Sequence, residues 1–222
     1  MKNAEFRDHR RKTILRFKEI LAANEPGHCD EQGLPSYTIA NPLMRWLTWT
    51  RVRVILAAIA KREHMKNTLD FGCGYGVFTE YLLQHSDHTL AFDLMIDELK
   101  PIGDKLGWKN ISYASDLKVL AGKNGSFDLI LATEVLEHVD DLEGMLRLFR
   151  DLLEPGGRLL ISGPTENFLY KIGRKLAGFS GEYHVRNIYT ILDAANKVFR
   201  PRKVATIFPI LTFYEVYECV KE

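Results

Sequence analysis

The chain has 222 residues, of which 46% are hydrophobic and 11% aromatic, and its formal net charge is +1. This composition allows a substantial buried core, and the near-neutral charge creates no overall field that would attract nucleic acid. The three cysteines, Cys29, Cys73 and Cys219, have the spacing of neither a disulfide framework nor a zinc site.

The N-terminal region predicts no targeting or membrane-spanning segment. Residues 1–20 are charged throughout, unlike a signal peptide. The most apolar window, Trp46 to Ala60, contains two arginines and is shorter than the roughly 20 apolar residues that cross a bilayer. We therefore expect a cytoplasmic protein.

Two helices are predicted before the first strand. Apolar residues at helical spacing indicate a basic helix over 3–23, and a Pro- and Gly-containing loop follows. Asn41-Pro42 can start a second helix that runs to about His64. We expect residues 1–65 to form a helical cap that contributes to a cofactor and substrate pocket, and residues 66–222 to form the main domain.

Short apolar segments and helical patterns then alternate, which is typical of right-handed βαβ crossovers in a parallel sheet. The expected strands are Thr68–Phe71, Thr89–Asp93, Ile111–Ala114, Phe127–Ala132, Arg158–Ser162, Lys203–Phe208 and Thr212–Val220. The expected helices are Val77–His85, Ile96–Leu106, Leu142–Leu153 and Asn187–Phe199.

The connection between the last two strands is too short for a parallel crossover, so these strands form an antiparallel hairpin. The predicted fold class is therefore α/β, with a doubly wound, Rossmann-like sheet of seven mostly parallel strands.

A glycine-rich turn follows the first strand. Asp70 precedes glycines at alternate positions, Gly72, Gly74 and Gly76, with Cys73 between them. Such a turn lets the backbone approach a ligand at the start of the next helix, where N–H groups are free. Val77 breaks the G-x-G-x-x-G pattern of dinucleotide-binding proteins. This disfavours an NAD(P)-dependent oxidoreductase.

Polar residues follow the other strands at the same predicted edge of the sheet, where ligands bind in open α/β folds. Asp93 can accept hydrogen bonds from both hydroxyls of a ribose, or it can cap the next helix. Asp116 can accept from an adenine amino group, or it can act as a turn residue. Further candidates at these strand ends are Leu94, Met95, Ser115, Leu117 and Thr133.

The region 66–163 resembles the class I methyltransferases that use S-adenosylmethionine (SAM). The motifs appear in family order: the D-x-G-x-G-x-G turn, Asp93, Asp116, the 134–139 segment Glu-Val-Leu-Glu-His-Val, and the 153–158 segment Leu-Glu-Pro-Gly-Gly-Arg. The branch that it resembles contains the ubiquinone- and menaquinone-pathway enzymes and many small-molecule O-methyltransferases. The resemblance implies SAM as cofactor. Asn41-Pro42-Leu43 also resembles the Asn-Pro-Leu-Arg segment of quinone-pathway O-methyltransferases, whose arginine reaches the SAM carboxylate. Arg51 is favoured over Arg45 for this role.

Two histidines are candidates for the base that activates a hydroxyl acceptor. His138 follows the fourth strand, and His184 lies in a polar loop before the helix over 187–199. The alternative for His138 is that it hydrogen-bonds the backbone and fixes its loop. The alternative for His184 is that it caps the following helix. Glu134, Glu137 and His138 also resemble a magnesium-binding segment of quinone-pathway enzymes, although the same segment occurs in relatives without metal.

Residues 164–186 lie where the family inserts a substrate lid. Within 164–179, apolar residues at helical spacing alternate with Lys171, Arg174 and Lys175. A basic amphipathic helix of this kind can lie on a membrane surface, although a packed lid with its basic side in water is the simpler interpretation.

The predicted function is methyl transfer from SAM, at oxygen, to a small-molecule or lipid-like acceptor, by a monomer or homodimer. Alternatives are transfer to nitrogen or carbon, and a SAM-binding protein without catalysis. A nucleic-acid partner is disfavoured because Thr133-Glu134-Val135-Leu136 replaces the Asn/Asp-Pro-Pro-Tyr/Phe signature of amino-methylating enzymes.

Overall fold

The structure is a computed structural model that describes residues 2–25, 34–165, 187–207 and 214–222. The chain divides into two compact units, residues 1–61 and 62–222. The sequence predicts the boundary at residue 65.

In its described residues, the first unit contains three helices, α1 (Asn3–Ala23), α2 (Leu34–Thr38) and α3 (Pro42–Ile59). The Asn41 side chain caps α3 by accepting hydrogen bonds from the N–H groups of Leu43 and Met44, and Pro42 occupies the first turn. Aromatic side chains hold the unit together, since Trp49 packs edge-on against both Phe6 and Tyr37. α3 ends at Ile59, five residues before the predicted end at His64.

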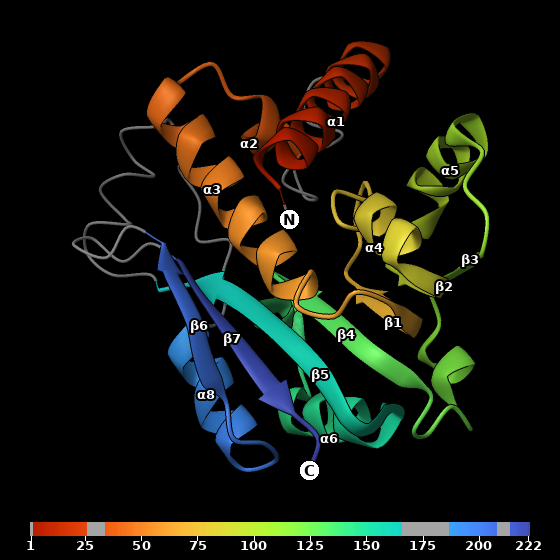
Figure 1. The fold of residues 1–222 in the computed structure, drawn as a ribbon, viewed down its shortest axis with the longest axis vertical. Coiled ribbons are helices and arrows are strands. Elements are labelled where there is room, and N and C mark those ends of the chain that lie inside the picture. Colours follow the sequence, from red (N-terminus) through yellow and green to blue (C-terminus); the bar gives the residue numbers. More distant parts are fainter. Residues whose placement is uncertain (1, 26–33, 166–186, 208–213) are drawn as a thin grey trace. The chain divides into compact units, whose positions relative to one another are not determined.

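The second unit contains one seven-stranded sheet (Figure 1). Its strands are β1 (Met65–Phe71), β2 (Ser86–Phe92), β3 (Ile111–Ala114), β4 (Phe127–Thr133), β5 (Leu153–Pro164), β6 (Arg202–Ile207) and β7 (Tyr214–Val220). Its α-helices are α4 (Thr79–His85), α5 (Lys100–Leu106), α6 (Leu142–Leu152) and α8 (Ile188–Asn196). Three short 3₁₀ helices also occur: η1 (Ile96–Glu98), η2 (Leu117–Leu120) and η3 (Leu136–His138).

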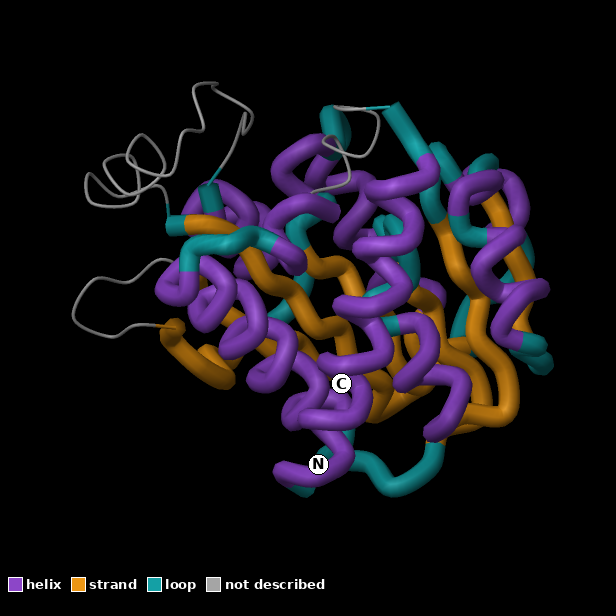
Figure 2. Tube along the Cα trace, turned by 90° about the horizontal axis from the view of Figure 1, so that it is seen from above, coloured by secondary structure: helices purple, strands orange, loops and turns teal. Residues whose placement is uncertain are grey.

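The strand order is β3-β2-β1-β4-β5-β7-β6. β1 to β5 are parallel, whereas β7 pairs antiparallel with both β5 and β6. Figure 2 shows the strands side by side as one layer. This confirms the predicted fold class, including the antiparallel pair at the C-terminal end.

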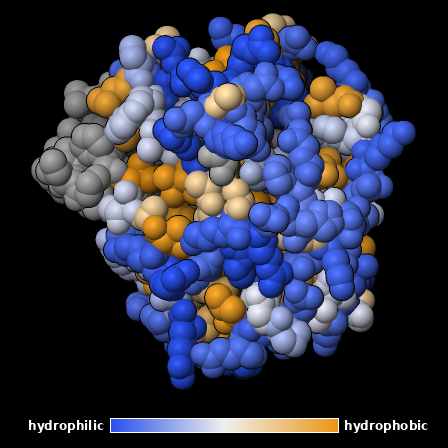
Figure 3. Space-filling model, viewed as in Figure 1, coloured by the Kyte–Doolittle hydropathy of each residue, from blue (hydrophilic) through white to orange (hydrophobic). Residues whose placement is uncertain are grey.

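Most side chains on the face shown in Figure 3 are hydrophilic, and apolar residues form small groups among them. Among the described residues, no helix is both long and apolar enough to cross a membrane.

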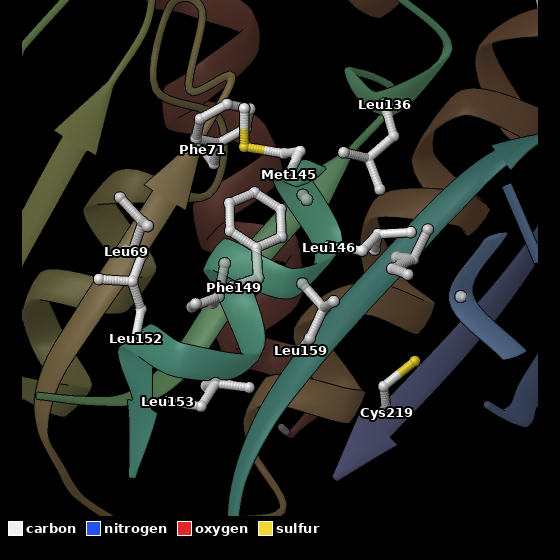
Figure 4. Close-up of a cluster of buried hydrophobic side chains, with 14 of the residues drawn as sticks. Leu69, Phe71, Leu136, Met145, Leu146, Phe149, Leu152, Leu153, Leu159 and Cys219 are labelled. Atoms are coloured by element: carbon white, nitrogen blue, oxygen red, sulfur yellow. The ribbon is translucent and has the colours of Figure 1, made fainter. Parts of the chain in front are cut away.

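The main core lies between the sheet and the helices α6 and α8. Phe149 of α6 contacts Phe71 of β1 edge-to-face at a centroid distance of 5.0 Å, and Phe71 stacks on Phe92 of β2 at 4.8 Å. Figure 4 shows side chains of α6 and of the sheet directed toward one another in this cluster. The opposite face of the sheet carries α4 and α5, with Ala91 of β2 packed near Leu99.

Candidate functional site

The strand order reverses between β1 and β4, which makes this edge the expected place for a ligand. Register pairs Phe71 with Phe92, and Phe92 with Ala114. The residues that follow these strands, the glycine turn, Asp93 and Ser115, therefore lie in adjacent positions along one edge of the sheet.

The glycine turn is tied to the end of β2. The N–H groups of Gly72 and Cys73 both donate to the Phe92 carbonyl, at 2.8 and 3.1 Å, and the Gly76 N–H donates to the Cys73 carbonyl. α4 begins only at Thr79, not at Val77 as predicted. The N–H groups of Gly72, Cys73 and Gly76 donate within the protein, and the role of N–H groups at the start of α4 toward a ligand stays a prediction.

Asp93 lies at the centre of the candidate site. One carboxylate oxygen accepts from the Gly74 N–H at 2.8 Å, and the other accepts from the Met95 N–H at 2.9 Å. The two bonds fix the carboxylate between the glycine turn and the loop after β2. An ionised carboxylate has about four acceptor positions, so each oxygen can accept a further hydrogen bond from a ligand.

Asp70 is the buried acid beneath the turn. Its carboxylate accepts a hydrogen bond from the Thr79 hydroxyl at 2.7 Å, and the residue is 2% exposed. Burial raises the pKa of Asp70 to about 7; the hydrogen bond from Thr79 lowers this pKa, and the charge of Asp93 raises it. Asp70 therefore supports the turn from inside, and its contact with a cofactor stays a prediction.

Cys73 is also buried in the turn. Burial, and then the charges of Asp70 and Asp93, raise the pKa of its thiol well above the ordinary value. The thiolate is the reactive form of cysteine, so Cys73 acts as a small buried filler at neutral pH.

Apolar side chains project beside the acids. Leu94, two residues after β2, is 84% exposed, and Leu117, the first residue of η2 after β3, is 42% exposed. Exposed leucines at a ligand-binding edge can pack on a flat ring. Met95 is half-buried, and Ser115 is exposed.

Asp116 caps the 3₁₀ helix η2. Its carboxylate accepts from the Lys118 N–H at 2.9 Å, and the side chain remains 65% exposed. The turn role considered in the sequence analysis is thus present. The exposed carboxylate can still accept from a ligand.

The segment after β4 has a constrained backbone. Thr133 is half-buried, and Glu134 has φ +54°, a left-handed conformation that costs a non-glycine residue of order 1–3 kcal/mol. The Glu134 N–H donates to the Ser162 carbonyl at 3.1 Å, which holds this conformation.

The three residues considered for magnesium differ in exposure. Glu137 is fully buried, whereas His138 is exposed. Among the residues that the structure describes, no three His, Cys, Asp or Glu side chains gather as a metal site requires. Partial burial lowers the pKa of the His138 imidazole from its ordinary value, which favours the neutral form.

Arg51 and His184 are two further predicted residues. Arg51 is buried in the first unit, where its guanidinium donates to the Tyr37 hydroxyl at 3.1 Å. Its role at a cofactor carboxylate stays a prediction. His184 and most of the lid, 166–186, lie outside the described residues.

Sequence comparison decides the family. A profile described as "Methyltransferase domain" matches residues 45–206, most of the chain. The chain belongs to the class I SAM-dependent methyltransferase family. This confirms the resemblance drawn from the motifs.

Curated relatives of this methyltransferase include ubiquinone biosynthesis O-methyltransferases. The protein from Xylella fastidiosa (strain M23) is 32% identical over 166 aligned positions, and the alignment covers 68% of this chain and 63% of the relative. The protein from Coxiella burnetii (strain RSA 331 / Henzerling II) is 35% identical over 107 aligned positions, and the alignment covers 46% of this chain and 45% of the relative. The chain thus spans between about half and just under two thirds of the curated relatives it matches.

Solved structures share the fold of this methyltransferase at low identity. The N-methyltransferase NodS from Bradyrhizobium japonicum, in complex with S-adenosyl-L-homocysteine (SAH), superposes with a TM-score of 0.60 at 19% identity, covering 94% of this chain and 98% of NodS. The [4+2]-cyclase SpnF superposes with a TM-score of 0.59 at 12% identity, covering 78% of this chain and 82% of SpnF.

Proposed function

We propose that this chain transfers a methyl group from SAM to an oxygen atom of a small-molecule or lipid-like acceptor, leaving SAH. The observation that carries the proposal is the Asp93 carboxylate, held by the N–H groups of Gly74 and Met95 beside the exposed Leu94. The names of the curated relatives support oxygen as the accepting atom.

The residues at the edge of the sheet fit SAM. The free acceptor positions of Asp93 suit the two ribose hydroxyls, and charged acceptors make the stronger hydrogen bonds. Leu94 and Met95 offer apolar surface for the adenine ring, and Asp116 offers an acceptor for its amino group. When bound, SAM supplies an activated methyl group, so catalysis consists largely of positioning.

A hydroxyl acceptor must also lose its proton. His138 suits this role because partial burial lowers the pKa of its imidazole, which favours the neutral form that can accept a proton. His184 is the second candidate. His138→Gln and His184→Gln separate the two candidates. The variant that lacks the base should have a kcat lower by roughly 10²- to 10⁴-fold, while the other variant should keep most of its activity.

Magnesium at Glu134, Glu137 and His138 is a further hypothesis. Carboxylates and an imidazole can hold a hard cation together with water. A chelator would abolish turnover if the metal is required, and full activity in chelator would remove the hypothesis.

The second candidate function is SAM binding without methyl transfer. SpnF, named as a cyclase, shares this fold, so the fold alone does not determine the reaction. Transfer to nitrogen is the other alternative, since NodS is named an N-methyltransferase.

The segment 164–179 is proposed to contact the acceptor and, if the acceptor is a membrane lipid, the membrane surface. The protein would then sediment with anionic liposomes at low salt, and exchange of Lys171, Arg174 and Lys175 for glutamate would release it. Absence of sedimentation would refute membrane contact and leave the methyltransferase proposal unchanged.

The test uses SAM labelled on its methyl group, incubated with the protein and with extract of the source organism. Products are partitioned into organic, aqueous and protein fractions, with Asp93→Ala as the control. Label in the organic phase that the variant loses would indicate a lipid-like acceptor, whereas label in the aqueous phase would indicate a polar metabolite. Bound SAM with no transfer to any fraction would favour the non-catalytic candidate.

A further inference from the structure

Ser162 carries a hydroxyl that the described part of the chain leaves without a hydrogen-bond partner. The residue lies near the end of β5, it is 0% exposed, and its Oγ is buried with no donor or acceptor. Its backbone is engaged normally, since its carbonyl accepts from the Glu134 N–H. Buried hydroxyls are normally satisfied, and an exception calls for an explanation such as a ligand or catalytic role.

Other buried hydroxyls of the second unit follow that rule. Ser86 donates to the Leu82 carbonyl at 2.9 Å, Thr68 and Thr89 bond to each other at 2.9 Å, and Thr79 donates to Asp70. Within the second unit, Ser162 therefore differs from these four hydroxyls; in the first unit, Thr13 of α1 is likewise buried without a hydrogen-bond partner among the described residues.

The position of Ser162 in the sheet places its hydroxyl on the face of the candidate site. Leu159 and Ile161 of β5 belong to the core cluster under α6 and α8. Because side chains alternate along a strand, Ser162 faces the other side of the sheet, the side of α4. Asp70 faces the same side, since its carboxylate bonds to Thr79 of α4.

Ser162 also lies at the carboxyl end of the sheet, beside the segment that follows β4. Its Cα partner in β4 is Thr133. Ala132 belongs to the core cluster, so alternation turns Thr133 to the same face as Ser162. Adjacent strands are about 4.8 Å apart, so the hydroxyls of Thr133 and Ser162 lie on neighbouring strands at this edge.

The candidates for adenosine lie on the other side of β1. Asp93, Leu94 and Asp116 follow β2 and β3, whereas Ser162 lies on β5, across β1 and β4. An acceptor must approach the cofactor from the side that the adenosine does not occupy. The end of β4 and β5 is that side.

We infer that the Ser162 hydroxyl contacts the methyl acceptor and hydrogen-bonds an alcohol or phenol oxygen of it. A hydroxyl both donates and accepts, so it can hold a neutral alcohol or phenol in either protonation state. This inference rests on the proposed function, because it requires that an acceptor binds next to SAM.

The test compares Ser162→Ala with Ser86→Ala, which removes a hydroxyl that has a structural partner. Thermal unfolding of both proteins is measured without ligand. Ser162→Ala should unfold at the temperature of the wild type or above it, because no hydrogen bond is lost. Ser86→Ala should unfold at a lower temperature. A fall for Ser162→Ala equal to that of Ser86→Ala would show an internal partner and overturn the inference.

Methyl transfer is then measured with labelled SAM and serial dilutions of an extract of the source organism. Ser162→Ala should need roughly tenfold more extract for half-maximal transfer, with an unchanged Kd for SAM, while Ser86→Ala should match the wild type. An unchanged half-saturating amount in Ser162→Ala would overturn this inference alone. Absence of transfer by the wild type would overturn the proposed function, and the inference with it.

Discussion

Gly72 and Val135 lie against each other where the strand order reverses. A Cβ built on Gly72 would fall 2.6 Å from the Val135 Cβ, and the Gly72 backbone has φ +76°. Two independent reasons therefore require glycine at this position, the left-handed backbone and the absence of space. Through this contact the glycine turn after β1 and the segment after β4 support each other.

Gly72→Ala should destabilise the protein more than strain alone explains. Gly122 provides the matched control, because it also has φ +76° but a Cβ there would meet nothing within 4 Å. We expect Gly122→Ala to lower the free energy of unfolding by about 1–2 kcal/mol, and Gly72→Ala by a further 1–3 kcal/mol or so from overpacking. Denaturant unfolding of both variants measures the difference, and equal losses would refute the steric role of Val135.

Gly74→Ala should separate binding from stability. Gly74 has φ +48°, and a Cβ there would point into open space with no heavy atom within 4 Å. The loss of unfolding free energy should therefore resemble that of Gly122→Ala. If the open space receives the cofactor, SAM affinity should fall by about tenfold or more, because the methyl group would occupy part of it. Calorimetric titration with SAM gives the result, and unchanged affinity would place the cofactor elsewhere.

Asp70→Asn should change how stability depends on pH. Folding raises the pKa of Asp70 from 3.8 to about 7, so between these values the folded protein retains a proton that the unfolded chain has lost. Stability then falls as the pH rises through this range, by roughly 4 kcal/mol for a shift of this size, and the cost is complete above about pH 7. Below pH 4 both states are protonated and the cost vanishes.

The asparagine variant removes this titration while keeping an oxygen that can accept from Thr79. It should therefore be more stable than the wild type at pH 8 and nearly equal to it at pH 4. The measurement is denaturant unfolding of both proteins at several pH values. Parallel pH dependences of the two proteins would show that Asp70 is ionised in the folded state at neutral pH.

Local patterns predict most of the sheet because each strand carries its own apolar signal. For β5, however, the local pattern predicts the wrong first residue. The sequence places this strand at Arg158–Ser162, yet it begins at Leu153 and includes Pro155, Gly156 and Gly157. These residues read locally as a loop, but Leu153 pairs with Phe127, and Gly156 and Gly157 bond to the backbone of Lys221. Long-range pairing overrides the local signal.

In the candidate site, too, local patterns predict some features, and long-range contacts decide the others. The positions of Asp93 and the glycines follow from strand ends that alternation and turn chemistry reveal. The hydrogen bond between Asp70 and Thr79 joins a strand to a helix, and the unpaired hydroxyl of Ser162 depends on which face its strand presents. Sequence spacing alone predicts none of these contacts.

Calorimetric titration with SAH tests most directly that this edge of the sheet binds the cofactor through Asp93. The comparison uses the wild type, Asp93→Ala and, as the matched control, Asp97→Ala, whose carboxylate is 87% exposed and pairs with Lys100. SAH should bind the wild type and Asp97→Ala alike, and Asp93→Ala should lose roughly a hundredfold in affinity because hydrogen bonds to a charged acceptor are removed. NAD⁺ should not bind. Equal affinity of SAH for all three proteins, or tighter binding of NAD⁺ than of SAH, would contradict the account.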